Sequence, residues 1–124
     1  MRENKDLKYT FRFSERLHLQ KDFDKIFKSG RKAVHPAIFV YSFSRNDRSK
    51  IRRLGLITSG KLGLAVKRNT LKRRLREIFR LNKHNLKTGI DLLFIPKKAA
   101  IDMDYHKLEE TVISLLEKLN AITV

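Results

Sequence analysis

The chain has 124 residues, of which 29 are lysine or arginine and 13 are aspartate or glutamate, so its formal net charge at pH 7 is +16. A small folded domain with this much charge repels itself, which indicates a polyanionic partner. The absence of cysteine excludes disulfide bonds, thiol nucleophiles and thiolate metal sites. With 41% hydrophobic residues and no break in composition, the chain predicts one modest core.

The positive charge is distributed unevenly. Residues 101–124 contain two lysines and five acidic residues, a net charge of −3, which leaves +19 on the first hundred residues. We therefore expect the C-terminal segment to lie away from the polyanion. The longest apolar runs, residues 37–41 and 92–95, are far shorter than the roughly 20 residues that span a bilayer, and charges interrupt the region where a secretory signal would begin. We expect a cytoplasmic protein with no membrane partner.

The N-terminal part of the chain predicts an arm followed by a helix. Residues 1–15 mix charges with scattered aromatics, which is typical of a flexible basic arm. A single domain that binds the polyanion is therefore expected over residues 16–124. Residues 19–30 place apolar side chains at helical spacing. Gly30 stands where a left-handed backbone conformation would end that helix.

Two β segments are expected next. Residues 33–44 predict one strand whose side chains alternate between two faces, both of them apolar. Ile38 and Val40 lie on one face, and the other face has three aromatics: Phe39, Tyr41 and Phe43. Residues 45–53 are polar and basic and predict a loop. Residues 54–59 predict a second β segment, which leads into a glycine-containing stretch.

The rest of the chain predicts helix, strand and helix. A helix of about four turns is expected over residues 64–81, and a strand over residues 90–96 after the break at Gly89. Asp104 is expected to cap the last helix, whose apolar residues recur on one face: Leu108, Val112, Leu115, Leu116 and Leu119. The resulting order, α-β-β(-β)-α-β-α, predicts an α+β sandwich in which helices cover one side of a small sheet.

The most informative stretch is residues 67–80, which read KRNTLKRRLREIFR and contain seven basic residues and one acid, Glu77. On a helical wheel, one stripe is apolar: Leu71, Leu75, Ile78 and Phe79. The opposite stripe is polar and basic: Asn69, Arg73, Arg76 and Arg80. Arginines on a packed helix lose little entropy on binding, and their forked guanidinium groups match phosphate oxygens. The stretch predicts a pre-organised phosphate-binding surface.

A solvated charged face is the ordinary alternative for such a helix. Those faces usually alternate in sign and form ion pairs between residues one turn apart. In residues 67–80 Glu77 is the sole acid available for pairing, so the pattern favours binding to an anion. On the wheel Arg68 falls near the apolar side unless the helix begins after it.

The same stretch resembles the bacterial ribonuclease P protein family, whose signature is an Arg-Asn-Arg triplet followed by Lys-Arg, Arg-Glu and an aromatic with Arg. The matching residues here are Arg68, Asn69, Thr70, Leu71, Lys72, Arg73, Arg76, Glu77, Phe79 and Arg80. The resemblance extends over residues 16–119 and includes Arg16-Leu17, Asp22-Phe23, Phe27, Gly30, Leu54-Gly55, Ser59, Lys61 and Gly63-Leu64-Ala65-Val66.

This chain departs from the family pattern at three positions. Thr70 replaces the second arginine of the triplet, Gly60 replaces a lysine that is usual before Lys61, and Leu64 replaces a common asparagine. These departures are expected to weaken local phosphate contacts without removing the basic stripe.

The resemblance implies a protein subunit of ribonuclease P, which binds a catalytic RNA and the 5′ leader of precursor tRNA and assists endonucleolytic 5′ maturation. It implies a three-layer fold with a left-handed βαβ crossover, where general rules predict a right-handed one. The implied RNA-binding residues are Lys61, Arg68, Asn69, Lys72, Arg73, Arg76 and Arg80. The implied holoenzyme requires Mg²⁺ bound by the RNA, and we infer no cofactor bound by the protein alone and no obligate protein partner.

The resemblance also implies a central cleft for the single-stranded leader. The candidates for it here are Phe23, Phe27, Phe39 and Tyr41, with Phe43 as a further strand aromatic. Aromatic side chains stack on unpaired bases with little sequence preference. Phe23 and Phe27 are core residues by default because they recur at helical spacing, so Tyr41 is the better candidate. For each of these aromatics, the sequence is compatible with a place in the cleft and with a place in the core.

No group of residues has catalytic or metal-site spacing. The four histidines, His18, His35, His84 and His106, are scattered, and we expect each to be structural or on the surface. Asp102 and Asp104 are better interpreted as capping residues at the start of the last helix than as a catalytic carboxylate pair. We therefore expect no catalytic residue and no metal ligand in this chain.

Two other functions fit part of the pattern. A ribosomal-type or general RNA-binding protein explains the charge but not the order of the motif, and it would not distinguish precursor tRNA from mature tRNA. A DNA-binding protein would place the basic stripe in a major groove, but the short turn and second helix of a helix-turn-helix are missing.

Overall fold

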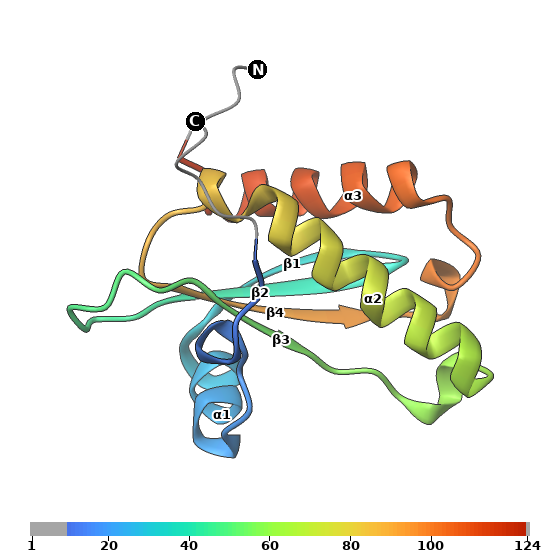
Figure 1. The fold of residues 1–124 in the computed structure, drawn as a ribbon, viewed down its shortest axis with the longest axis horizontal. Helices are drawn as coiled ribbons and strands as arrows, with labels where there is room; N and C mark the ends of the chain where they lie inside the picture. The colour runs from blue at the N-terminus through green and yellow to red at the C-terminus, as the bar shows by residue number, and fades with distance from the viewer. Residues whose placement is uncertain (1–9, 124) are drawn as a thin grey trace.

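A computed structural model describes residues 10–123, which form a four-stranded sheet between helical layers (Figure 1). The elements follow in the order α1 (Gln20–Ser29), β1 (Arg31–His35), β2 (Ile38–Ser44), β3 (Arg53–Leu56), α2 (Ala65–Asn82), β4 (Ile90–Pro96) and α3 (Tyr105–Lys118). Four short 3₁₀ turns join them: η1 (Phe13–Glu15), η2 (Gly60–Leu62), η3 (Lys83–Asn85) and η4 (Lys98–Ala100). The predicted α+β class and the order of its elements are confirmed.

The sheet has the strand order β1-β2-β4-β3. β1 pairs with β2 and β2 with β4 in antiparallel register, whereas β3 pairs with β4 in parallel. The parallel pair is joined through α2, so β3, α2 and β4 form a βαβ unit. The left-handed crossover of that unit stays a prediction.

The prediction of one strand over residues 33–44 was wrong, because this segment belongs to a hairpin of β1 and β2. The turn lies at Pro36, which has no amide proton for a sheet hydrogen bond. His35 Nδ1 accepts a hydrogen bond from the Ala37 amide at 3.0 Å and closes the turn. Only residues 33–35 of β1 fall within the predicted strand, and this stretch is too short for alternation alone to reveal the break. The second β segment is also shorter than expected, since β3 ends at Leu56.

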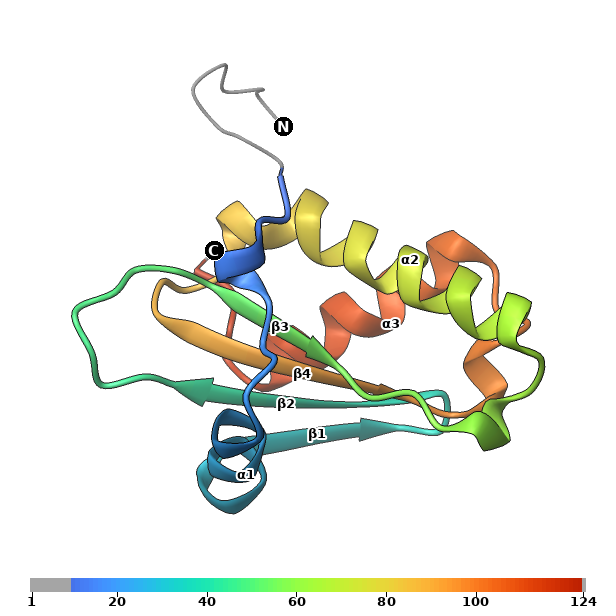
Figure 2. The ribbon, with the colours of Figure 1, turned by 60° about the horizontal axis from the view of Figure 1, so that its bottom comes forward.

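Helices cover both faces of the sheet, which corrects the prediction that they cover one side. α2 and α3 lie on one face, and α1 lies on the other, as both ribbon views show (Figures 1 and 2). The larger core fills the space between the sheet and α2 and α3. A smaller cluster lies on the α1 face and is formed by Leu17, Ile26 and Leu93 with partly buried neighbours. The predicted faces of β2 are confirmed, because Ile38 and Val40 belong to the larger core.

Two glycines allow α1 to pack closely on the sheet. Gly30 ends α1, but its φ of −77° is not left-handed, so the predicted reason for this glycine was wrong. A Cβ at Gly30 would lie 2.5 Å from the Ile26 carbonyl oxygen, so glycine is required by a close approach of the backbone. A Cβ at Gly55 would lie 2.8 Å from the Phe23 ring, so this glycine makes room for α1 above β3.

The start of α3 is capped as predicted. The Asp104 carboxylate accepts a hydrogen bond from the His106 amide at 3.1 Å. Asp102 does not take part in the cap, contrary to the prediction, and its exposed carboxylate lies 3.9 Å from the Lys67 ammonium. Arg74 joins α2 to the segment that precedes α3, because its guanidinium donates to the Met103 carbonyl at 3.2 Å.

A buried ion-pair network joins the loop before β3 to the centre of the sheet. The Asp91 carboxylate on β4 is 3% exposed and receives Arg45 at 2.5 Å and Arg53 at 2.8 Å. Arg53 also lies 3.6 Å from Asp22 on α1. The hydrogen bonds that Arg53 donates to the Asp91 carboxylate raise the pKa of Arg53 above its ordinary value. One buried carboxylate therefore compensates two partly desolvated cations.

The segment before α1 docks on the end of α2. The ammonium of the buried Lys83 lies 2.8 Å from the Glu15 carboxylate and 2.5 Å from the Thr10 carbonyl oxygen. The rings of Phe11 and Phe79 meet edge to face at 5.4 Å, and the Arg16 guanidinium lies 4.4 Å above Phe11. The predicted arm thus divides in two: residues 10–15 pack on the domain, and residues 1–9 lie outside the described residues.

We predict that Asp91→Ala lowers the free energy of unfolding by about 3–5 kcal/mol, because it leaves two cations of the network without their buried partner. Asp47→Ala is the matched control, since Asp47 pairs with the same Arg45 at 3.2 Å but is 53% exposed. Its loss should be about 0–1 kcal/mol. Urea denaturation of both variants provides the comparison, and equal losses would contradict the importance of the buried pair.

Candidate nucleic-acid interface

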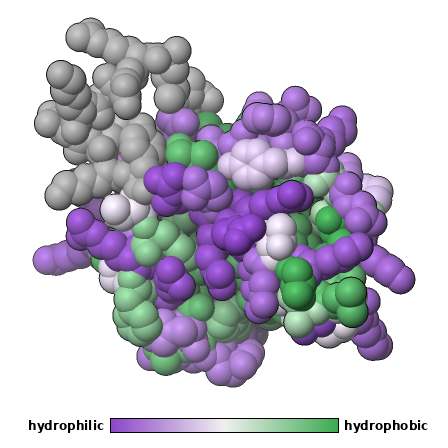
Figure 3. All heavy atoms as spheres, turned by 45° about the vertical axis from the view of Figure 1, so that its right-hand side comes forward, coloured by the Kyte–Doolittle hydropathy of each residue, from purple (hydrophilic) through white to green (hydrophobic). Residues whose placement is uncertain are grey.

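The apolar stripe of α2 is buried and fixes the orientation of the helix. Its four predicted residues are each at most 2% exposed and belong to the larger core: Leu71, Leu75, Ile78 and Phe79. This stripe faces the sheet and α3, so the opposite side of the helix faces solvent. Hydrophilic side chains gather on the face of the molecule shown in Figure 3, with apolar patches below them. Packing therefore presents the basic side of α2 on a rigid support.

Three cations on this side of α2 have no ionic partner in the part of the chain that the structure describes. Arg73 is exposed, and Lys72 and Arg76 are half-buried. Within residues 10–123 the structure gives these three side chains no hydrogen bond and no ion pair. Asn69, one turn before Arg73, is exposed as well. We call Asn69, Lys72, Arg73 and Arg76 the basic face of α2.

Arg80 differs from the other predicted members of the stripe. Its guanidinium forms a two-point ion pair with Glu77, in which Arg80 Nε donates to the carboxylate at 2.9 Å. Hydrogen bonding to Arg80 lowers the pKa of Glu77, and the same bond raises the pKa of Arg80. The Glu77 charge thus offsets Arg80 at this end of the stripe, and the three cations before it carry the unbalanced charge.

Arg68 organises the loop that enters α2. Its guanidinium donates to the Gly63 carbonyl at 2.5 Å and approaches the Gly60 carbonyl at 3.5 Å. This geometry explains the ambiguous wheel position of Arg68, because its side chain folds back over the loop. Lys61 in the same loop is exposed, and its amide donates to the Ser59 hydroxyl at 3.1 Å. Arg68 thus holds the loop that presents Lys61.

The three departures from the family pattern have visible local consequences. The Thr70 hydroxyl donates to the Val66 carbonyl one turn earlier at 3.0 Å, so it turns into the helix backbone. Gly60 is open to solvent, and Leu64 is 73% exposed.

The first turn of α2 contains no acidic residue. The positive end of the helix dipole is therefore left without negative charge from its own first turn.

The sheet face that carries α1 is partly open. α1 covers one end of that face, and the other end lies uncovered in both ribbon views (Figures 1 and 2). Ala33 points into the larger core, so its neighbours Lys32 and Val34 point to the α1 side. The register places Val34 beside Phe39, and Phe39 beside Ile95. These residues form an apolar row across β1, β2 and β4.

Two lysines lie against the aromatic side chains of this row. The ammonium of Lys97 lies 4.2 Å from the centre of the Phe39 ring, and that of Lys32 lies 4.6 Å from it. Lys32 also lies 5.7 Å from the Tyr41 ring, which in turn meets Phe27 edge to face at 5.1 Å. We call Phe27, Lys32, Phe39, Tyr41 and Lys97 the aromatic-lysine surface.

The other two aromatic candidates lie elsewhere. Phe23 is partly buried and packs on the smaller core under α1, which is the role expected by default for a helix aromatic. Phe43 lines a hollow of about 640 Å³ between α1 and the loop before β3, together with Lys21, Lys25, Arg45 and Arg53. Ring contacts and the shared Lys32 therefore join Phe27, Phe39 and Tyr41. Phe23 and Phe43 meet this group only through the smaller core, on which Tyr41 also packs.

Sequence reasoning missed both lysines of the aromatic-lysine surface. Lys32 precedes the segment that was interpreted as one strand, and the hairpin is what places it opposite Tyr41. Lys97 follows β4 and stands two residues after Ile95. The period of two along a strand could have identified them. Lys32 stands two residues before Val34 and Lys97 two residues after Ile95, so each lysine points to the same side of the sheet as that residue.

The described chain offers little support for other kinds of site. Within residues 10–123, no three histidine, aspartate or glutamate side chains come together in a group suited to a metal ion. No helix in that part of the chain combines the length and the apolarity needed to span a membrane.

Comparisons with known proteins agree on one family. A family model described as Ribonuclease P matches residues 11–120. The ribonuclease P protein component of Thermotoga maritima is 38% identical over 114 residues, which cover 89% of this chain and 96% of the relative. That of Desulfosudis oleivorans is 37% identical over 110 residues, which cover 89% of each chain.

Solved structures give the same result. The RNase P protein of Staphylococcus aureus superposes with a TM-score of 0.79 at 28% identity and covers 88% of this chain and 98% of its own. The RNase P protein of Thermotoga maritima superposes with a TM-score of 0.73 at 35% identity and covers 84% and 96%. Family model, relatives and fold agree over nearly the whole described chain, and the chain therefore belongs to the ribonuclease P protein family, the protein components of the ribonucleoprotein that matures the 5′ end of tRNA.

Proposed function

We propose that this chain holds the catalytic RNA of ribonuclease P on the basic face of α2 and the 5′ leader of precursor tRNA on the aromatic-lysine surface. The observation that carries the proposal is the set of three cations on α2 that have no ion pair within residues 10–123: Lys72, Arg73 and Arg76. Their helix is fixed by four buried apolar residues, so little ordering entropy is lost when phosphates bind.

The geometry of the aromatic-lysine surface suits an unpaired RNA strand. Phe27 is exposed and Phe39 and Tyr41 are partly exposed, so their rings could stack on unpaired bases, at about 1–3 kcal/mol for each base and with little sequence preference. Lys32 and Lys97 stand beside these rings and would neutralise the phosphates that follow the bases. Low sequence preference fits leaders that differ from one tRNA precursor to another.

The division of labour follows from the chemistry available. We propose that the RNA and its bound Mg²⁺ carry out phosphodiester hydrolysis and that this chain binds, orients and screens charge. The residues that support the proposal are cations and aromatics, which bind RNA but do not activate water for attack. We further propose that the protein works in the cytoplasm, where its precursor tRNA substrate would be encountered.

The first test is charge reversal on α2. We predict that the double variant Arg73→Glu, Arg76→Glu binds a bacterial ribonuclease P RNA at least about tenfold more weakly and lowers the salt dependence of log K by about two, because two phosphate contacts are lost. Lys107→Glu, Lys118→Glu on α3 is the matched control with the same change in net charge. Equal losses for both double variants, with both folded by circular dichroism, would remove α2 from the interface.

The second test compares two substrates. We predict that Tyr41→Ala weakens holoenzyme binding of precursor tRNA by the stacking contribution, about 1–3 kcal/mol, and leaves mature tRNA nearly unchanged. A general RNA-binding protein would lose affinity for both RNAs equally. Thermal unfolding must accompany the assay, because truncation of a buried aromatic costs about 3–5 kcal/mol of stability and imitates a binding defect.

The third test varies Mg²⁺. We predict that raising Mg²⁺ partly restores precursor cleavage by the RNA when the protein is omitted, because divalent ions replace the screening that the protein supplies. The protein without RNA should cleave no precursor at any Mg²⁺ concentration. Cleavage by RNA-free protein that persists after repurification would overturn the assignment of chemistry to the RNA.

A further inference from the structure

A second basic site lies at the C-terminal end of α2. It is a pocket of about 190 Å³ formed by three segments: residues 10–15, the loop before β3 and the start of η3. Four cations line it, Arg12, Lys50, Arg52 and Lys83, together with His84. Among the lining residues that the structure describes, Glu15 is the sole carboxylate, so these side chains carry a net charge of +3 with neutral histidine.

The single carboxylate of the pocket is already engaged. Glu15 receives the Lys83 ammonium at 2.8 Å and the Arg12 backbone amide at 2.8 Å. The remaining cations have little local compensation: within residues 10–123 the Arg12 and Lys50 side chains have no ion pair or hydrogen bond. Arg52 donates through Nε to the Leu86 carbonyl at 2.9 Å, which leaves its two terminal nitrogens for another partner. Partial burial lowers the pKa of Arg52.

The walls of the pocket are held in place before any ligand arrives. The loop carrying Lys50 is tied to the sheet by Arg45, which binds Asp91 and the Ile51 carbonyl oxygen. The Gly89 amide also donates to the Lys50 carbonyl at 3.3 Å. Lys83 ties the segment of Thr10 and Glu15 to the end of α2. A concave cluster of cations that is pre-organised in this way favours an anion with several acceptor oxygens.

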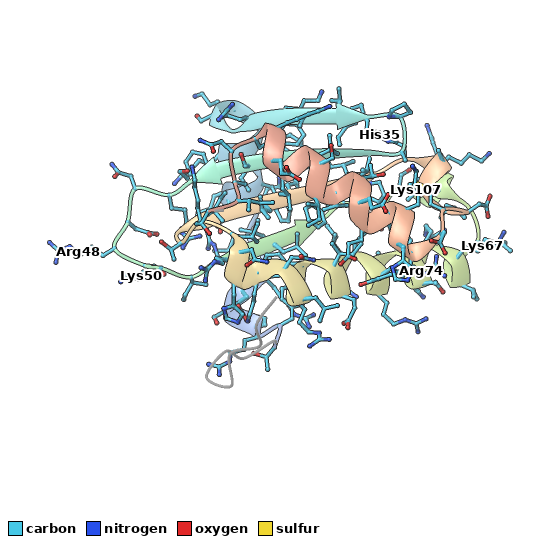
Figure 4. All side chains as sticks on the ribbon, turned by 90° about the horizontal axis from the view of Figure 1, so that it is seen from above. His35, Arg48, Lys50, Lys67, Arg74 and Lys107 are labelled. Carbon is cyan, nitrogen blue, oxygen red and sulfur yellow. The ribbon has the colours of Figure 1, made fainter. Side chains whose placement is uncertain are left out.

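We propose that this pocket binds a backbone phosphate of RNA and forms a contact site separate from the basic face of α2. In Figure 4 Lys50, which lines the pocket, lies at one end of the molecule, and Lys67, in the first turn of α2, lies at the other. α2 has 18 residues and spans about 27 Å. The RNA contact thus extends along the whole helix. The identity of the anion as RNA rests on the proposed function, and the RNA is either the catalytic RNA or precursor tRNA.

The test uses the full chain with Arg12→Ala and Lys50→Ala, two side chains without structural partners in the described chain. Arg48→Ala, Lys107→Ala removes the same charge outside the pocket and serves as the control; Arg48 lies on the same loop as Lys50 (Figure 4). Affinity is measured against salt in two arms: a transcribed bacterial ribonuclease P RNA with the protein, and precursor tRNA with the assembled holoenzyme.

We expect the pocket variant to lose at least about threefold in affinity in one arm and to lower the salt dependence of log K by about one, whereas the control changes neither. Loss in the first arm identifies the catalytic RNA as the source of the phosphate, and loss in the second identifies the precursor. Equal values for pocket and control variants in both arms would overturn the proposal. Arg73→Glu, Arg76→Glu in the same assay reports separately on the proposed function, since its failure would leave the pocket result standing.

Discussion

The central strands β2 and β4 carry apolar side chains on both faces, and exposure of either face to water is unfavourable. One face is covered completely by α2 and α3, which bury the larger core. The other face is covered at one end by α1, and β2 extends beyond this helix (Figure 2). The uncovered end keeps aromatic rings accessible between lysines. The same constraint therefore explains the core, the orientation of α2 and the surface proposed for the leader.

Burial on one side of α2 determines its chemistry on the other. Because Leu75 and Ile78 are locked in the core, Arg73 and Arg76 project from a rigid element and need no partner from the fold itself. Elsewhere the chain neutralises its cations where they are buried: Asp91 binds Arg45 and Arg53, and Glu15 binds Lys83. The contrast between paired interior cations and unpaired surface cations locates the excess charge where an RNA could reach it.

Sequence reasoning predicted the elements with strong local signals and missed those that depend on tertiary packing. The periodicity of residues 67–80 and the cap at Asp104 are local properties, and both were predicted correctly. The hairpin at Pro36 and the place of α1 on the opposite face depend on which strands pair, which alternation alone does not reveal. Arg68 and Arg80 share a motif with Arg73, yet one holds a loop and the other pairs with Glu77. A motif identifies a helix, but contacts decide which cations remain available.

The central claim is that two different surfaces of one small domain bind two parts of the RNA machinery. Its most direct test is a titration of the ¹⁵N-labelled protein with a short single-stranded RNA of leader sequence, followed by amide chemical shifts. The account predicts that the largest shifts occur in β1, β2 and around Lys97, with Arg73 and Arg76 little changed. Shifts confined to α2, with β1 and β2 unaffected, would contradict it.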